Sequence, residues 1–119
     1  MALSDNLSNL GTKAKVFKDP DLSNAIVDNV LGTSGSIKVI RAVNADSNLT
    51  YFKAYDANNP TSGTDEPDFI VPVAASSNVS IYFVNGLTFS NSACIIGSRT
   101  AGLANTATAV DLAVDIISG

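Results

Sequence analysis

The chain has 119 residues, a net charge of −4 and a single cysteine, and it contains no histidine or tryptophan. A chain of this length forms one domain with one hydrophobic core. Without histidine, the sequence excludes His-based general acid–base catalysis, Ser-His-Asp and Cys-His nucleophiles, and zinc sites rich in His or Cys. The acidic balance argues against nucleic-acid binding, which requires a basic surface.

Charged residues make up only 15% of the chain, and 14 Ser, 9 Thr and 12 Asn supply most of its polarity. Side chains of this kind suit strand surfaces, turns and broad protein contacts rather than enzyme active sites. We therefore predict a protein that is not an enzyme and that uses no cofactor or metal. The charge is uneven, with a net +1 over residues 1–53 and −5 over residues 54–119.

The first fifteen residues lack the basic start and unbroken apolar stretch of a secretory signal. No apolar run reaches the eighteen or more residues that a membrane helix needs. We expect a protein that is made in the cytoplasm and does not enter a membrane.

Residues 1–20 are polar, carry three lysines and end in the turn signal Asp19-Pro20-Asp21. This composition predicts an extended N-terminal arm ahead of a single domain over residues 21–119. The next stretch, Leu22–Leu31, fits either a short helix or a bulged strand, and we favour the strand. Gly32-Thr33-Ser34-Gly35 should close it as a loop.

Alternation of apolar side chains predicts a strand from Ser36 to Val43, with Ile37 and Val39 on the same face. Residues 44–48 form a turn cluster, and Leu49–Asp56 is a second β-rich run with Tyr51, Lys53 and Tyr55 on one face. Two such runs joined by five turn-forming residues predict a hairpin.

Ala57–Pro67 has no apolar periodicity and predicts a surface loop whose two prolines fix its shape. Phe69–Val73 reads as a short strand, and Pro72 within it indicates an edge or a bulge. Asn78–Asn85 alternates clearly and should end at the turn signal Asn85-Gly86.

Short β-patterned runs then follow at residues 87–90 and 93–97, and the period of two is clearest at Ala109–Ile117. In that last run Val110, Leu112, Val114 and Ile116 face one way. About seven short strands with frequent turns predict an all-β fold, namely an antiparallel β-sandwich or jelly roll. The pattern does not decide the order of the strands.

The acidic residues Asp56, Asp65, Glu66 and Asp68 flank the long loop, where oxygen ligands can hold calcium. Their spacing matches no established ligand pattern, so we interpret them as residues of a solvated loop with Asx-type turn hydrogen bonds.

Asp111 and Asp115 lie on the outward face of the last strand. Residues four apart along a strand are about 13 Å from each other, too far to act on one bond, so we interpret these acids as an exposed strand face. Cys94 stands in an apolar run, and with no histidine to activate it we interpret it as a buried apolar residue.

A series of short motifs over residues 32–118 resembles small virion proteins of tailed bacteriophages, particularly phages that infect cyanobacteria and other aquatic bacteria. The motifs are Gly35-Ser36-Ile37, Val43-Asn44-Ala45, Tyr51-Phe52-Lys53-Ala54-Tyr55-Asp56, Pro60-Thr61-Ser62-Gly63-Thr64, Ile70-Val71-Pro72-Val73 and Gly86-Leu87-Thr88-Phe89-Ser90. The resemblance implies a virion structural protein, such as a capsid decoration or cement protein, and brings no catalytic residues with it.

From this resemblance and the β pattern we expect a homotrimer that binds the outer surface of the phage head and stabilises contacts between major capsid subunits. The predicted partner-facing residues are Lys13, Lys15, Phe17 and Lys18 in the arm and Tyr51 and Tyr55 in the aromatic run. The alternatives are an adaptor in the tail, neck or fibre of the virion, and a carbohydrate- or calcium-binding module that uses the loop from Asp56 to Asp68.

Overall fold

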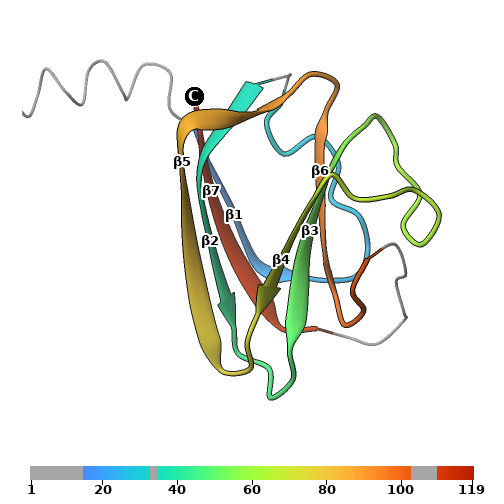
Figure 1. Ribbon diagram of the computed structural model, residues 1–119, viewed down its shortest axis with the longest axis vertical. Helices are drawn as coiled ribbons and strands as arrows, with labels where there is room; N and C mark the ends of the chain where they lie inside the picture. Colours follow the sequence, from blue (N-terminus) through green and yellow to red (C-terminus); the bar gives the residue numbers. More distant parts are fainter. Residues whose placement is uncertain (1–14, 33–34, 103–109) are drawn as a thin grey trace, which may run out of the picture.

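The structure is a computed structural model that describes residues 15–32, 35–102 and 110–119. These residues form seven antiparallel strands joined by loops, and no helix occurs among them (Figure 1). The strands are β1 (Lys15–Leu22), β2 (Gly35–Asn44), β3 (Thr50–Asp56), β4 (Phe69–Val73), β5 (Ser77–Phe89), β6 (Ala93–Ser98) and β7 (Leu112–Ser118). The all-β prediction is therefore confirmed for the described part of the chain.

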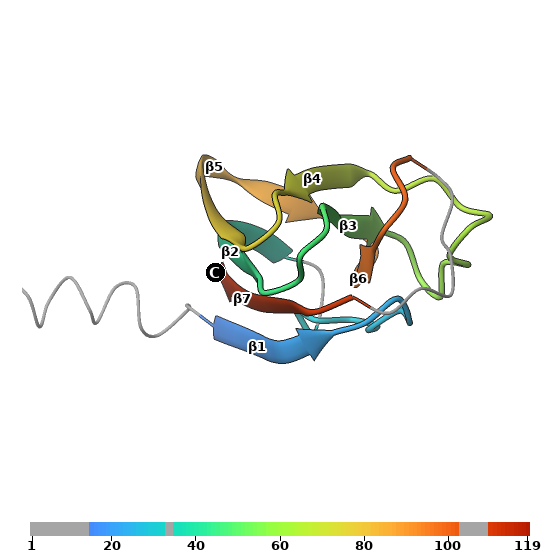
Figure 2. The same cartoon turned by 90° about the horizontal axis from the view of Figure 1, so that it is seen from below.

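The strands form a four-stranded sheet in the order β1-β7-β2-β5 and a three-stranded sheet in the order β4-β3-β6. Figure 2 shows β1 and β5 at opposite ends of the larger sheet, with β5 next to β4 of the smaller one. β7, the last of these strands in sequence, lies between β1 and β2. The larger sheet is therefore complete only when β7 pairs with both of them. The jelly-roll wiring allowed by the sequence is not confirmed.

One hydrophobic core lies between the two sheets. Alternate residues of each strand point into it because successive side chains of a strand face opposite ways. The larger sheet contributes Ile40, Ala42, Leu112, Val114 and Ile116, and the smaller sheet contributes Phe52, Ala54, Val71, Val73 and Ile95. The inward face predicted for the last strand is confirmed.

A β-bulge in β2 changes which residues face this core. Ile37 pairs with Ser118 and Val39 pairs with Ile117, so Lys38 is an extra residue relative to β7. An extra residue moves every later side chain to the opposite face. Ile37 is buried, but after the bulge the buried residues are Ile40 and Ala42, so the predicted grouping of Ile37 with Val39 is wrong.

The predicted turn at Asn85-Gly86 is also wrong, because β5 continues through it as far as Phe89. Ile37 pairs with Leu87 and Val39 with Tyr82, so the strand carries a wide bulge over residues 83–86 opposite Lys38 alone. Gly86 adopts a φ of 79°, and a Cβ there would lie 3.0 Å from the Cβ of Ser36. The glycine serves a bulge rather than a hairpin turn.

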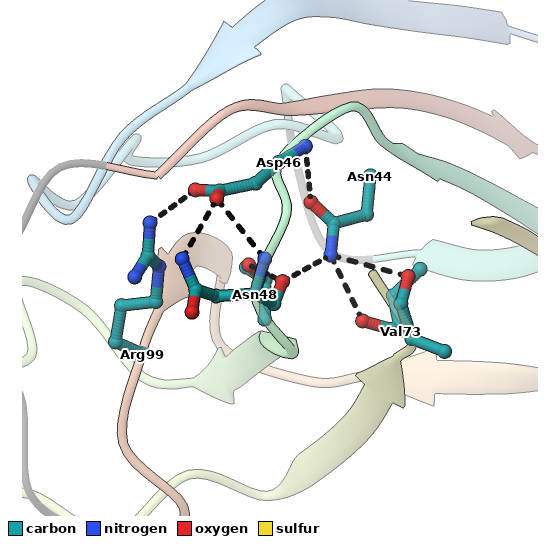
Figure 3. Close-up of polar contacts among 7 residues, drawn as sticks. Asn44, Asp46, Asn48, Val73 and Arg99 are labelled. Carbon is teal, nitrogen blue, oxygen red and sulfur yellow. Dashed lines mark hydrogen bonds and ion pairs between the residues drawn. The ribbon is translucent and has the colours of Figure 1, made fainter. Parts of the chain in front are cut away.

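The predicted hairpin of residues 36–43 with 49–56 does not form, since β2 and β3 belong to different sheets. A polar cluster holds the connection between them (Figure 3). The buried Asn44 amide donates hydrogen bonds to the backbone oxygens of Asn48 at 2.8 Å and Val73 at 3.0 Å. The Asp46 carboxylate accepts from the Asn48 backbone N–H and pairs with Arg99. These contacts direct the chain across to the second sheet.

The predicted arm over residues 1–20 is not confirmed, because Lys15–Pro20 lies in β1 and pairs with β7. Residues 1–14, including Lys13, lie outside the described residues. The strand favoured for residues 22–31 reduces to the end of β1 and one bridge between Val27 and Ile95. Both differences arise from long-range pairing, which local composition does not encode.

Candidate functional site

The predicted partner-facing residues that the structure describes do not form one surface. Lys15 and Lys18 are exposed on β1, whereas the Phe17 side chain is half-buried and packs against the core. Tyr51 and Tyr55 lie on β3 in the other sheet, and Tyr55 is 1% exposed. The Tyr55 side chain is therefore covered in the folded chain, and its contact with a partner stays a prediction.

Tyr55 instead belongs to a small second cluster with Cys94 and Ile96 on the outer face of the three-stranded sheet. Burial raises the pKa of its hydroxyl, which has Ser62 and Asp65 of the long loop nearby. Lys53 lies on the same strand face and is fully buried, and burial lowers its pKa. The loop over residues 57–67 thus lies against Tyr55, which looked available in the sequence.

The three aspartates in and beside this loop accept hydrogen bonds from the backbone. The Asp56 carboxylate accepts N–H bonds from Asn91 at 2.8 Å and Ser90 at 3.3 Å, and the bond from Asn91 is the main reason that its pKa is lowered. The Asp68 carboxylate accepts the backbone N–H of Asp56 at 2.7 Å, and the Asp65 carboxylate accepts the backbone N–H of Thr61 at 2.6 Å. The described residues contain no group of three or more His, Cys, Asp or Glu suited to a metal ion.

Cys94 is fully buried, as the sequence predicts. Its thiol lies 3.5 Å from Asp28 Oδ1 and 3.4 Å from the Ala57 carbonyl oxygen, and both can accept its proton. Burial raises the pKa of this thiol. A protonated, buried thiol is a poor nucleophile.

The β1 edge of the larger sheet carries charge and proline. Lys15, Lys18, Asp19, Pro20 and Asp21 all lie in this strand. Lys18 on β1 and Arg41 on β2 each approach the Asp115 carboxylate on β7, at 4.0 and 3.9 Å. Charges and proline at a sheet edge oppose pairing with a further strand.

Both edges of the smaller sheet are also protected. β4 presents the exposed Pro72, which confirms the predicted edge position. β6 is covered by the segment that follows β1, where Val27 and Ile95 exchange two backbone hydrogen bonds of 2.9 and 3.0 Å. Gly97 donates a further one to Ser23.

The β5 edge differs from the other three, because its thirteen residues include no charged residue and no proline. In the described part of the chain β5 pairs only with β2, in regular register from Ser77 to Tyr82 before the wide bulge. Tyr82 and Val84 are 72% and 95% exposed on one face. On the other face Val79, Ile81 and Phe83 are only half-buried, and Phe83 makes an edge-to-face contact with Phe69.

Sequence reasoning missed this edge, although the signal was present. The predicted alternation already places Tyr82 and Val84 opposite Val79, Ile81 and Phe83, and the run contains no charge. What the sequence did not reveal was the strand order, which leaves β5 at an edge.

Comparison with known proteins gave no match, either to a family model, to a curated protein or to a solved structure. The described residues also contain no helix long and apolar enough to cross a membrane.

Proposed function

We propose that this chain is a structural assembly protein that docks to a partner by adding a partner strand to the β5 edge. The carrying observation is the uncharged, half-covered β5 edge, in a molecule whose other three sheet edges are charged, interrupted by proline or covered. Strand addition satisfies the open backbone groups of an edge and gains specificity from alternate side chains. We class the arrangement of the two packed sheets as a β-sandwich.

A partner strand along residues 77–84 would cover apolar side chains on both faces of β5 and would contact the exposed Val84. Val79 and Ile81 remain half-exposed because none of the described strands lies beyond them, and the Tyr82 side chain is exposed on the opposite face. Burying apolar surface stabilises such a contact by about 25 cal/mol per Å² before the costs of association. An uncharged contact also weakens little in salt, which suits a permanent assembly.

The motif resemblance supports a phage virion as the assembly, and a capsid decoration or cement role on the head as the position within it. On this proposal the partner strand comes from the major capsid protein, and the chain stabilises contacts between capsid subunits on the outside of the head. The runner-up position is an adaptor in the tail, neck or fibre. A head protein is present in proportion to the capsid subunits, whereas an adaptor is present in few copies.

The test compares two exposed valines on the two edges of the larger sheet, Val84 on β5 and Val16 on β1. The natural chain, V84K and V16K are sedimented with phage heads that lack the protein. We expect the natural chain and V16K to bind in numbers that follow the capsid subunits, and V84K to bind at least about tenfold more weakly. Circular dichroism confirms that both variants fold.

The outcomes separate the parts of the proposal. Equal binding of V84K and V16K would remove β5 as the docking edge. Binding to purified tails but not to heads would place the protein with the adaptors, and binding to neither would overturn the virion role. Analytical ultracentrifugation of the natural chain measures its mass in solution and so tests the predicted homotrimer.

A further inference from the structure

A polar cavity of about 320 Å³ opens at the end of the molecule that carries the long loop. Three segments distant in sequence line it, namely residues 28–32, residues 58–59 and residues 91–94. In Figure 1 the long loop lies at the right, on the side away from β5.

Hydrogen bonds within the chain hold the walls of this cavity in place. Asn29 has a φ of 53° and is fixed by its side-chain bond to the Gly32 oxygen at 3.1 Å and by a backbone bond from Gly32. On the opposite wall, the Asp56 carboxylate holds the backbone of Asn91 at 2.8 Å. The backbone of Ala57 donates to Ser92 at 3.0 Å and ties the loop to the floor. A pocket built in this way is largely formed before a ligand arrives.

The groups that face the cavity differ in how far the protein already uses them. The Ser92 hydroxyl donates to the Asn29 side-chain oxygen at 3.4 Å, and the Cys94 thiol contacts Asp28. The amides of Asn58 and Asn59 are exposed and make no hydrogen bond within the described part of the chain. Asn59 is also held in the left-handed region, at a φ of 52°.

The chemistry of the lining limits the ligand. Asp28 is the only carboxylate among the described lining residues, and a Cβ built on Gly32 would lie 3.8 Å from Lys15 Nζ, so neither sign of charge prevails there. No aromatic ring is among the described lining residues, so the flat face of a nucleobase finds nothing to stack on. Side-chain amides offer a donor and an acceptor side by side, which matches neighbouring hydroxyls on a sugar ring.

We propose that this cavity binds one ring of an uncharged saccharide, with Asn58, Asn59 and Asp28 as the principal hydrogen-bonding partners. The site shares only Asn58 and Asn59, at the start of the acidic loop, with the saccharide site that the sequence allows, and it is separate from the β5 edge. The saccharide proposal can therefore be tested independently of the docking proposal.

The test is a titration of the ¹⁵N-labelled full chain with glucose, galactose, mannose and N-acetylglucosamine, followed by NMR. We expect at least one of these sugars to shift the side-chain amide signals of Asn58 and Asn59 in a saturable way in the millimolar range. Replacing both residues (N58A/N59A) should weaken binding at least about tenfold. The matched control N78A/N85A removes two exposed asparagines from β5 and should bind like the natural chain.

Several results would overturn the proposal. These are shifts that do not saturate for any of the four sugars, equal binding by N58A/N59A and the natural chain, or a response to calcium chloride alone. The V84K variant distinguishes the two proposals, since it should lose docking to heads and keep sugar binding.

Discussion

β1 and β5 occupy the two ends of the same sheet, yet their sequences treat those positions in opposite ways. β1 carries two lysines, two aspartates and a proline, and its charged side chains continue into a ladder with β7 and β2. β5 is longer and carries no charge. An edge without charge or proline is a hazard for aggregation unless it has a partner. The contrast indicates that one edge is closed to strand addition and the other is available for it.

The largest expected effect separates the anchoring of β1 from the exposure of β5. Leu22 ends β1 and is fully buried, so Leu22→Ala should lower the free energy of unfolding by about 2–5 kcal/mol. Val84→Ala on β5 should change it by less than about 0.5 kcal/mol, because that side chain is almost fully exposed. Urea unfolding followed by circular dichroism measures both. A costly Val84→Ala would mean that β5 serves stability rather than docking.

The next effect concerns the point where β5 begins. Asn44 pairs with Ser77, and its buried side-chain amide donates hydrogen bonds to three backbone oxygens. Asn44→Ala leaves these oxygens without their donor and should lower the free energy of unfolding by about 1–3 kcal/mol. Asn78→Ala, one residue further along β5 and exposed, is the matched control and should cost almost nothing. Equal effects would contradict the role of the polar cluster.

Acid should destabilise the fold near both ends of β5, because a hydrogen-bonded aspartate carboxylate lies close to each end. The Asp46 carboxylate accepts the Asn48 N–H and pairs with Arg99, and the Asp56 carboxylate accepts the Ser90 N–H. Burial raises the pKa of Asp46, but the bonds from Asn48 and Arg99 outweigh it and leave that pKa lowered. The pKa of Asp56 is lowered mainly by the Asn91 N–H.

Carboxyls with lowered pKa values stabilise the fold above their unfolded pKa of about 4, and this contribution is lost as the pH falls through the folded values. The urea concentration at which half of the protein is unfolded should therefore decrease when the pH is lowered below about 4. This decrease should be smaller in Asp56→Asn. An identical acid profile for that variant would show that Asp56 does not contribute.

The smallest effect tests the charge ladder beside β1. Lys18, Arg41 and Asp115 are partly exposed, and exposed ion pairs contribute about 0.2–1 kcal/mol. Asp115→Asn should lower the free energy of unfolding by that amount at low salt, and the difference should disappear at high salt. A loss that persists in salt would mean that Asp115 acts through packing instead.

Local patterns in the sequence predicted individual strands well. The period of two in the last strand gave the buried set of Leu112, Val114 and Ile116, and Pro72 marked an edge strand correctly. These features depend on alternation and on the missing N–H of proline, both of which are properties of the chain itself.

The same patterns failed where distant segments decide. The turn residues at 44–48 allow a hairpin, but the bonds from Asn44 to Val73 and from Arg99 to Asp46 hold the chain where it crosses to the other sheet. The sequence pattern left Tyr55 available for a partner, but in the folded chain the long loop lies against it. The three segments around the cavity meet only in the folded protein, so no local motif announced that site.

The sequence by itself determined the all-β class, the scarcity of charge and the absence of histidine chemistry, because composition and alternation act residue by residue. Only the tertiary structure decided which strand stands at an edge, since strand order depends on pairings between residues far apart in the chain. The uncharged run at residues 77–89 acquires its meaning there. In the middle of a sheet it would be ordinary, and at the edge it becomes the surface best suited to a partner.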